Sequence, residues 1–188
     1  MGLTIFFLFF LAIIVIAIII RNQIVRYFNA TRRAWSDVAT YERQKLKVLD
    51  ELTPLVEQYS TFEQETLQKV IQLRQSILNL NLENTDIHQL QQIESLNREL
   101  MQHLNVVVEN YPELKADEIY LRMMNEIDEQ NDNVSAAITI FNRNVELFNN
   151  QIEVFPNNLI NTLTLGKKTI RPFRDPVTTQ SFDYRPNF

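Results

Sequence analysis

Cysteine is absent from this 188-residue chain, and glycine occurs only at Gly2 and Gly166. Without cysteine the chain cannot form disulfides, zinc knuckles, iron–sulfur clusters or a catalytic thiolate. Two glycines so far apart cannot form a phosphate-binding loop, a dinucleotide-binding fingerprint or a nucleophile elbow, since each needs several glycines close together. These absences exclude many kinds of enzyme, and the length allows one domain with an appendage.

Histidine is nearly as scarce. His88 and His103 are fifteen residues apart, which is about 22 Å along one helix, so they cannot share a site. Glu99 and His103 are one residue too far apart for the Glu-x-x-His motif of di-iron bundles. We therefore expect no catalytic residue, no metal site and no cofactor, and we identify no small-molecule substrate.

An acidic stretch on the last long helix is the one candidate for cation chemistry. It comprises Glu126, Asp128, Glu129 and Asp132. Carboxylates three and four residues apart on a helix are neighbours and can in principle bind a cation. A solvated helix face is the favoured alternative, because no loop glycine or carbonyl-rich turn completes an oxygen cage.

An apolar run begins the chain. The eighteen residues from Leu3 to Ile20 contain one polar side chain, that of Thr4, and as a helix they cover about 27 Å, which nearly spans a bilayer core. No basic residue precedes the run and no small-x-small cleavage site follows it, so an uncleaved anchor is favoured over a signal peptide. Residues 1–21 are therefore predicted to be a single-pass transmembrane anchor that contacts the lipid bilayer through residues 3–20.

The charges that flank the run predict its orientation. Basic residues collect on the cytoplasmic side of a span, and here they follow the run, at Arg21, Arg26, Arg32 and Arg33. The expected topology places the N-terminus outside and the bulk of the chain on the cytoplasmic side.

Residues 22–166 are predicted to be helical, because apolar residues recur there in steps of three and four. The first helix continues from the anchor and is expected to kink or restart at Pro54. The second is expected to begin near Thr61, after a capping box of Ser60 and Glu63. Thr85 or Asp86 is expected to cap the third, which Pro112 ends.

The fourth helix carries a heptad seam of the coiled-coil type. Its members are Tyr120, Met124, Ile127, Asn131, Val134, Ile138, Phe141, Val145, Phe148, Ile152 and Phe155. Four such apolar faces with short links predict an all-α fold, in which the transmembrane helix continues into an antiparallel up-and-down four-helix bundle. Asn131 is the one polar member of the seam; it either sets the register or reaches solvent near a bundle end.

Charge divides the chain into three parts. Residues 1–33 carry +4, residues 34–166 carry −12 and residues 167–188 carry +3. The acidic middle argues against binding to nucleic acid. Residues 167–188 are predicted to be an extended, flexible basic tail that either contacts anionic lipid or stays solvated without a partner. Its basic residues nearest the bundle are Lys167, Lys168, Arg171 and Arg174.

Several segments together resemble the LemA family. They are Arg33 to Val38, Pro54 to Glu57, Tyr111 to Ala116, Phe148-Asn149 and Phe155 to Ile160. The resemblance covers essentially the whole chain in order. It implies a bacterial protein of the cytoplasmic (inner) membrane with a four-helix soluble domain, and partners such as a membrane protease.

The resemblance also selects candidate residues for partner binding or assembly. These are Asn149, Asn157 and Asn158, beside Trp35 and Asn131. A core position for Trp35 and a helix-capping role for Asn157 or Asn158 are the structural alternatives. The family's Arg-rich stretch after paired alanines is missing here, since Ile138 follows Ala136 and Ala137.

Three functions remain open. The leading one is a non-enzymatic, membrane-anchored scaffold or adaptor of the LemA type, which acts by self-assembly as a homo-oligomer or by docking a membrane protein. The second is a membrane-organising protein whose oligomers and basic tail act directly on the bilayer. The third is a cation-dependent sensor or enzyme that uses the acidic stretch of the fourth helix.

Overall fold

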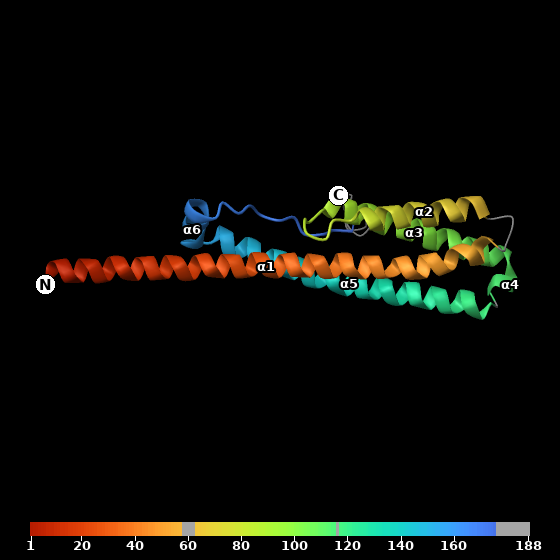
Figure 1. The fold of residues 1–188 in the computed structure, drawn as a ribbon, viewed down its shortest axis with the longest axis horizontal. Helices are drawn as coiled ribbons and strands as arrows, with labels where there is room; N and C mark the ends of the chain where they lie inside the picture. Colours follow the sequence, from red (N-terminus) through yellow and green to blue (C-terminus); the bar gives the residue numbers. More distant parts are fainter. Residues whose placement is uncertain (58–62, 116, 176–188) are drawn as a thin grey trace, which may run out of the picture. The chain divides into compact units, whose positions relative to one another are not determined.

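The computed structural model describes residues 1–57, 63–115 and 117–175. Within these ranges every regular element is a helix, which confirms the all-α fold, and successive long helices reverse direction (Figure 1). The helices are α1 (Gly2–Glu57), α2 (Glu63–Asn79), α3 (Ile87–Asn110), α4 (Pro112–Lys115), α5 (Glu118–Glu153) and α6 (Asn157–Thr164).

Helix α1 joins the apolar run to the later residues without a break. It has 56 residues and includes Pro54, so the helix does not restart there. The expected start of the second helix at Thr61 and the capping role of Ser60 lie outside the described residues.

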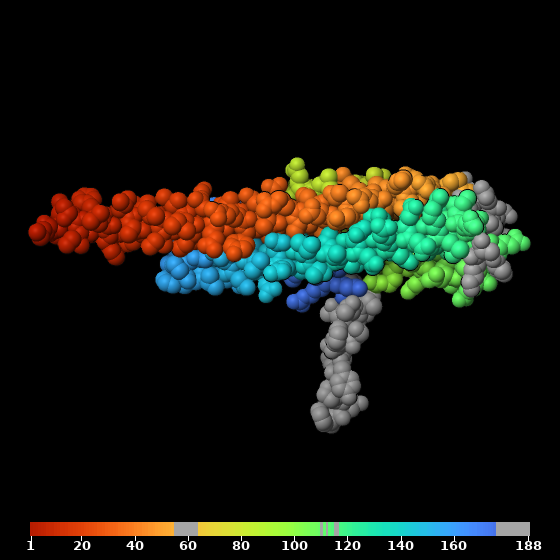
Figure 2. All heavy atoms as spheres, turned by 90° about the horizontal axis from the view of Figure 1, so that it is seen from below, coloured from red at the N-terminus to blue at the C-terminus, as the bar shows by residue number. Residues whose placement is uncertain are grey.

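The N-terminal part of α1 is the one candidate membrane span in the described chain, with a mean hydropathy of 3.4 and no buried residue in its most apolar window. Its large side chains are exposed, from Leu3 at 73% to Ile19 at 58%. In the view of Figure 2 no other segment covers the red first part of this helix.

Local capping sets the start of α3. Asp86 precedes the helix, and its Oδ1 accepts a hydrogen bond from the Gln89 N–H at 2.9 Å, which confirms Asp86 as the cap. At the other end, the Tyr111 N–H donates to the Val107 carbonyl at 3.0 Å. Pro112 then begins the single turn of α4, because proline is tolerated at the first position of a helix.

Contacts group the chain into two compact units. The first combines Met1–Ala34 with Ile140–Pro172, and the second combines Trp35–Thr139 with the segment that begins at Phe173. Both α1 and α5 therefore supply residues to each unit.

The second unit has an apolar core from four helices. Its fully or almost fully buried side chains include Trp35, Val38, Leu49 and Leu52 of α1, Leu73 and Ile77 of α2, Leu90 and Ile93 of α3, and Ile127 and Val134 of α5. The Trp35 indole N–H donates to the Asn81 carbonyl at 2.8 Å. Trp35 is thus a core residue, as the structural alternative predicted, with its polar end satisfied.

The first unit has a smaller core. Ile24 of α1 packs with Phe148 and Ile152 of α5, and partly buried side chains surround them, namely Ile20, Tyr27, Phe28, Leu165 and Ile170. The Phe28 and Phe148 ring centroids are 5.5 Å apart. Because Ile20 ends the apolar run, this core lies next to the end of the candidate span.

The heptad seam of α5 is buried over most of its length, at Tyr120, Ile127, Val134, Phe141, Val145, Phe148 and Ile152. Met124 and Ile138 are half-buried, while their neighbours Met123 and Ala137 are buried. The prediction for Phe155 is wrong, since its side chain is 77% exposed. The reason is that α5 ends at Glu153, so the helical period no longer directs Phe155 inward.

Candidate functional site

A buried cluster of charged side chains lies in the second unit. Glu42 and Lys45 are 0% and 1% exposed, although charged side chains are almost never fully buried unless they are paired. The Lys45 Nζ lies 3.3 Å from Glu42 Oε2 and 3.9 Å from Glu94 Oε1 of α3. Among the described side chains, neither the carboxyl oxygens of Glu42 nor Lys45 Nζ has a well-directed hydrogen bond.

Burial changes the chemistry of this cluster. The pKa of the Glu42 carboxyl is raised from 4.5 to about 8, mainly because burial removes it from water; the neighbouring Glu94 adds to this rise and the Lys45 ammonium opposes it. Glu42 is therefore largely protonated in the folded chain at neutral pH. Sequence reasoning missed this cluster because an isolated charged pair on an apolar helix face normally indicates a solvated position.

Asn131 lies opposite another asparagine. The Nδ2 of Asn97, a residue of α3 that is 7% exposed, donates to Asn131 Oδ1 at 3.0 Å. Asn131 itself is half-buried. A polar pair between two helix faces favours one helix alignment, because sliding either helix would leave the buried Asn97 amide without this partner.

Asn149 holds a chain segment that follows α6, which we call the strap (residues 167–172). Its Nδ2 donates to the Ile170 carbonyl at 2.8 Å, and its Oδ1 accepts from the Ile170 N–H at 2.9 Å. One side-chain amide thus pairs with both backbone groups of one residue, as a neighbouring strand would. Asn149 has a structural contact within the first unit.

The strap corrects the expectation of a flexible tail for its described part. Besides the Asn149 pairing, Ile170 packs on the core around Phe148, and the Lys167 Nζ lies 3.7 Å from the centroid of the Phe28 ring. In the second unit, Arg98 pairs with Asp175 at 3.0 Å. The segment is extended but attached, because side-chain amides and apolar contacts hold a backbone that has no helical hydrogen bonds. The tail from residue 176 onward lies outside the described residues.

Replacing Asn149 with alanine is expected to release the strap. The variant loses both hydrogen bonds to Ile170 and leaves two backbone groups unpaired, which costs about 1 to 3 kcal/mol locally. Trypsin cleavage after Lys168 should therefore accelerate by about tenfold or more. Asn150→Ala is the matched control, because Asn150 is exposed on the same helix. Equal cleavage rates in the two variants would show that the Asn149 amide does not hold the strap.

Asn157 and Asn158 lie at the start of α6, where a short helix was expected. Asn157 is 9% exposed, and the Asn158 Oδ1 accepts from the Leu159 N–H at 2.8 Å. The residue at the cap position is Pro156, and no side chain caps the helix there, so the expected capping role is wrong for both asparagines. Helix α6 begins at Asn157, so both asparagines lie in its first turn.

Sequence reasoning did not select Asn161. Its side-chain amide pairs with both backbone groups of Lys167, as the Asn149 amide pairs with those of Ile170. The Asn161 Nδ2 donates to the Lys167 carbonyl at 2.8 Å, and its Oδ1 accepts from the Lys167 N–H at 3.0 Å. Between these residues Gly166 adopts a φ of 60°, a conformation that favours glycine. That glycine was the available signal for a tight turn at the end of α6.

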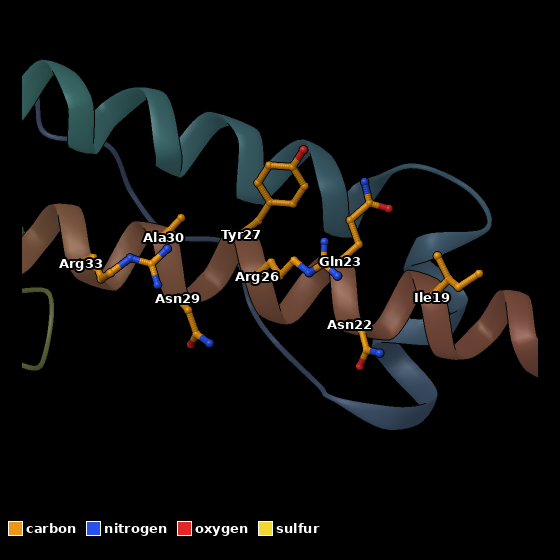
Figure 3. Close-up of a pocket in the computed structure, with 8 residues that line it drawn as sticks. All are labelled: Ile19, Asn22, Gln23, Arg26, Tyr27, Asn29, Ala30 and Arg33. Carbon is orange, nitrogen blue, oxygen red and sulfur yellow. The ribbon is translucent and has the colours of Figure 1, made fainter.

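A surface groove of about 570 Å³ follows the apolar run along α1. Figure 3 shows its eight lining residues, from Ile19 to Arg33, with Asn22 and Asn29 pointing to one side of the helix and the Tyr27 ring to the other. Arg26 and Arg33 supply its charge, and both are exposed. Guanidinium groups at such a position suit phosphate or other anionic groups.

The remaining predicted basic residues are not gathered into one site. Arg21 and Arg32 are exposed on α1, as are Lys168, Arg171 and Arg174 after α6. The Arg174 carbonyl accepts a hydrogen bond from Gln91 at 2.8 Å. The four arginines that closely follow the apolar run, at positions 21, 26, 32 and 33, therefore lie on an exposed surface of α1.

The candidates for metal chemistry are dispersed in the part of the chain that the structure describes. No group of three or more His, Cys, Asp or Glu side chains is placed there to hold a metal ion. Glu126 is half-buried, and Asp128, Glu129 and Asp132 are exposed along α5. His103 lies beside Thr66, with Nε2 and Oγ1 at 2.9 Å, and its Nδ1 is 3.7 Å from Glu65 Oε1.

Comparison with known proteins places these features in context. The sequence model of the LemA family matches residues 34–174. Protein LemA of Metamycoplasma hominis is 32% identical over 123 residues, which are 65% of this chain and 54% of that protein. The match thus spans about half the length of the relative. The matched family region includes Trp35, the buried Glu42 cluster, the asparagines of α5 and α6, and the strap.

Proposed function

This chain belongs to the LemA family, and from that premise we propose that it is a membrane-anchored, non-enzymatic helical scaffold or adaptor. It acts by self-assembly or by docking a membrane protein. The proposed location is a bacterial cytoplasmic membrane, with the N-terminus outside and the bundle on the cytoplasmic side.

One observation carries the proposal: the continuous helix α1. Its first part exposes an uninterrupted apolar surface, whereas its later part supplies buried core residues such as Trp35 and Leu52. An exposed apolar stretch of that length is unfavourable in water and matches a bilayer core. A bundle whose own core helix continues from the anchor is held next to the membrane, where it can contact a membrane protein.

Two further features support the proposal. Exposed arginines follow the span within about twenty residues, as the positive-inside rule requires of a cytoplasmic flank. The polar interior contacts, including Asn97–Asn131 and Glu42–Lys45, join helices or helix turns to one another. We interpret such contacts as serving the specificity of the fold.

Purification of the tagged, full-length protein from native membranes in mild detergent tests this function. Mass determination should give either a homogeneous multiple of 22.2 kDa, which supports self-assembly, or a complex with a stoichiometric second membrane protein, which supports an adaptor. A homogeneous monomer without a second protein would contradict both forms of the proposal. Recovery in the soluble fraction would contradict the membrane anchor.

A matched variant separates the anchor from the bundle. In this variant an unrelated transmembrane helix replaces residues 1–20. If the bundle carries assembly or docking, the variant should retain the same complex. If the complex is lost while the variant stays in the membrane, the anchor itself makes the contact, and the bundle is not the scaffold.

A further inference from the structure

Helix α6 has its polar and apolar faces reversed with respect to the protein interior. Its buried side chains are asparagines, Asn157 at 9% and Asn161 at 7% exposure. Its exposed face carries Leu159 at 51% and Leu163 at 80%, continuing from Phe155 at 77%. A helix on a water-facing surface normally turns its apolar side chains inward.

The strap prevents α6 from rotating to bury these leucines. The Asn161 amide makes two hydrogen bonds to the Lys167 backbone, at 2.8 and 3.0 Å, and the Gly166 N–H donates to the Asn161 carbonyl at 2.7 Å. The Gly166 bond belongs to the end of the helix, but the strap is itself tied to Asn149, so a rotation of α6 about its axis would strain the two amide bonds to Lys167. The outward direction of the apolar face is therefore set by the first unit itself.

The position of α6 indicates what this face meets. Leu165, directly after the helix, packs on the Ile24, Phe148 and Ile152 core together with Ile20, the last residue of the apolar run. Figures 1 and 2 both place the blue end of the chain, with α6, beside the early part of α1. The helix thus lies at the level where the candidate span ends and the head-group region of a bilayer begins.

The charge pattern favours lipid over a protein partner. Helix α6 contains no charged residue, while Lys168 is exposed directly after its turn and Arg21 is exposed directly after the span. Glu153, at the end of α5, is the nearest acidic residue before it in the sequence. An apolar helix face with basic residues close by is typical of helices that lie in a membrane interface.

We propose that α6 lies in the plane of the bilayer surface, on the leaflet from which α1 emerges, with Phe155, Leu159 and Leu163 in the boundary between head groups and acyl chains. This inference rests on the proposed membrane anchor. It gives the chain a second membrane contact, made by the first unit after the chain has returned along α5. The first unit is then held by two contacts with the bilayer instead of one.

Site-directed spin labelling tests the proposal on the full-length chain, which has no native cysteine to interfere. Single variants Leu163→Cys, Leu11→Cys and Leu78→Cys carry a nitroxide, and each protein is reconstituted in vesicles of phosphatidylglycerol and phosphatidylethanolamine. Leu11 reports on the anchor, and its side chain is 56% exposed. Leu78 is the matched control, an apolar side chain of α2 that is 57% exposed.

The accessibility of each label to oxygen and to a water-soluble nickel complex gives its depth. We expect the label at 163 to be at least severalfold more accessible to oxygen relative to nickel than the label at 78, and the label at 11 to be deeper still. A label at 163 that matches the one at 78, with the label at 11 in the hydrocarbon, would overturn the proposal and leave the anchor intact. A label at 11 in water would overturn the anchor, and with it the proposal.

Discussion

Raising the pH from about 5 to about 8 is expected to lower the free energy of unfolding of the full-length chain in detergent micelles. Burial holds the pKa of the Glu42 carboxyl at about 8 in the folded chain, against 4.5 without it. At a pH between 4.5 and about 8, Glu42 keeps its proton in the folded chain and releases it in the unfolded chain. Glu42 protonation therefore stabilises the fold fully below pH 4.5, and this stabilisation is lost as the pH rises toward 8. The loss is on the order of a few kcal/mol.

Glu42→Gln isolates this effect, because a neutral amide imitates the protonated carboxyl and does not titrate. Chemical denaturation, followed by the circular dichroism of the helices, should show a flatter dependence of stability on pH in this variant. Glu51→Gln is the control, since Glu51 is exposed on the same helix, and it should retain the dependence. The same slope in Glu42→Gln as in the unmodified chain would contradict the buried, protonated carboxyl.

The second large effect is expected at Phe148. This residue is 0% exposed and packs on Ile24, Ile152 and the Phe28 ring. Truncation to alanine removes most of the aromatic contact in a small core and leaves a cavity, so the free energy of unfolding should fall by about 3 to 5 kcal/mol. Urea denaturation of the full-length chain in micelles measures the change.

Leu147→Ala provides the comparison for Phe148. Leu147 is the preceding residue on α5 and is 41% exposed, so its truncation should cost less than about 1 kcal/mol. Equal losses in the two variants would show that α5 is destabilised by any truncation, and that the Phe148 core does not stabilise the first unit.

Local features of the fold could be predicted because their causes are local. The Asp86 side chain reaches the N–H of Gln89 three residues on, and such a contact needs no distant partner. The steps of three and four along α5 predicted the burial of Val134, Phe141 and Val145, because one helix face meets the interior wherever the other helices come from. The pattern was misleading at Phe155, where the helix had already ended.

The contacts of the candidate site depend on partners far along the chain. Glu94 joins Glu42 and Lys45 only because α3 packs beside α1, and no helix period contains that information. Asn149 was selected from a family resemblance, but its hydrogen bonds to Ile170, 21 residues later, arise from the return of the strap. All the residues that line the groove belong to α1. Because no distant segment is needed, the sequence alone predicted that Arg26 and Arg33 follow the apolar run.

The sequence by itself determined the helical fold, the apolar run, the uneven charge and the family, since these follow from composition, periodicity and order along the chain. Only the tertiary structure decided which polar groups are buried and which apolar ones stay outside. Glu42 is buried and Leu163 is exposed, against the hydropathy of each residue. The physical reason is that burial is a property of the packed assembly of helices: a side chain follows the helix that carries it, and long-range contacts orient that helix.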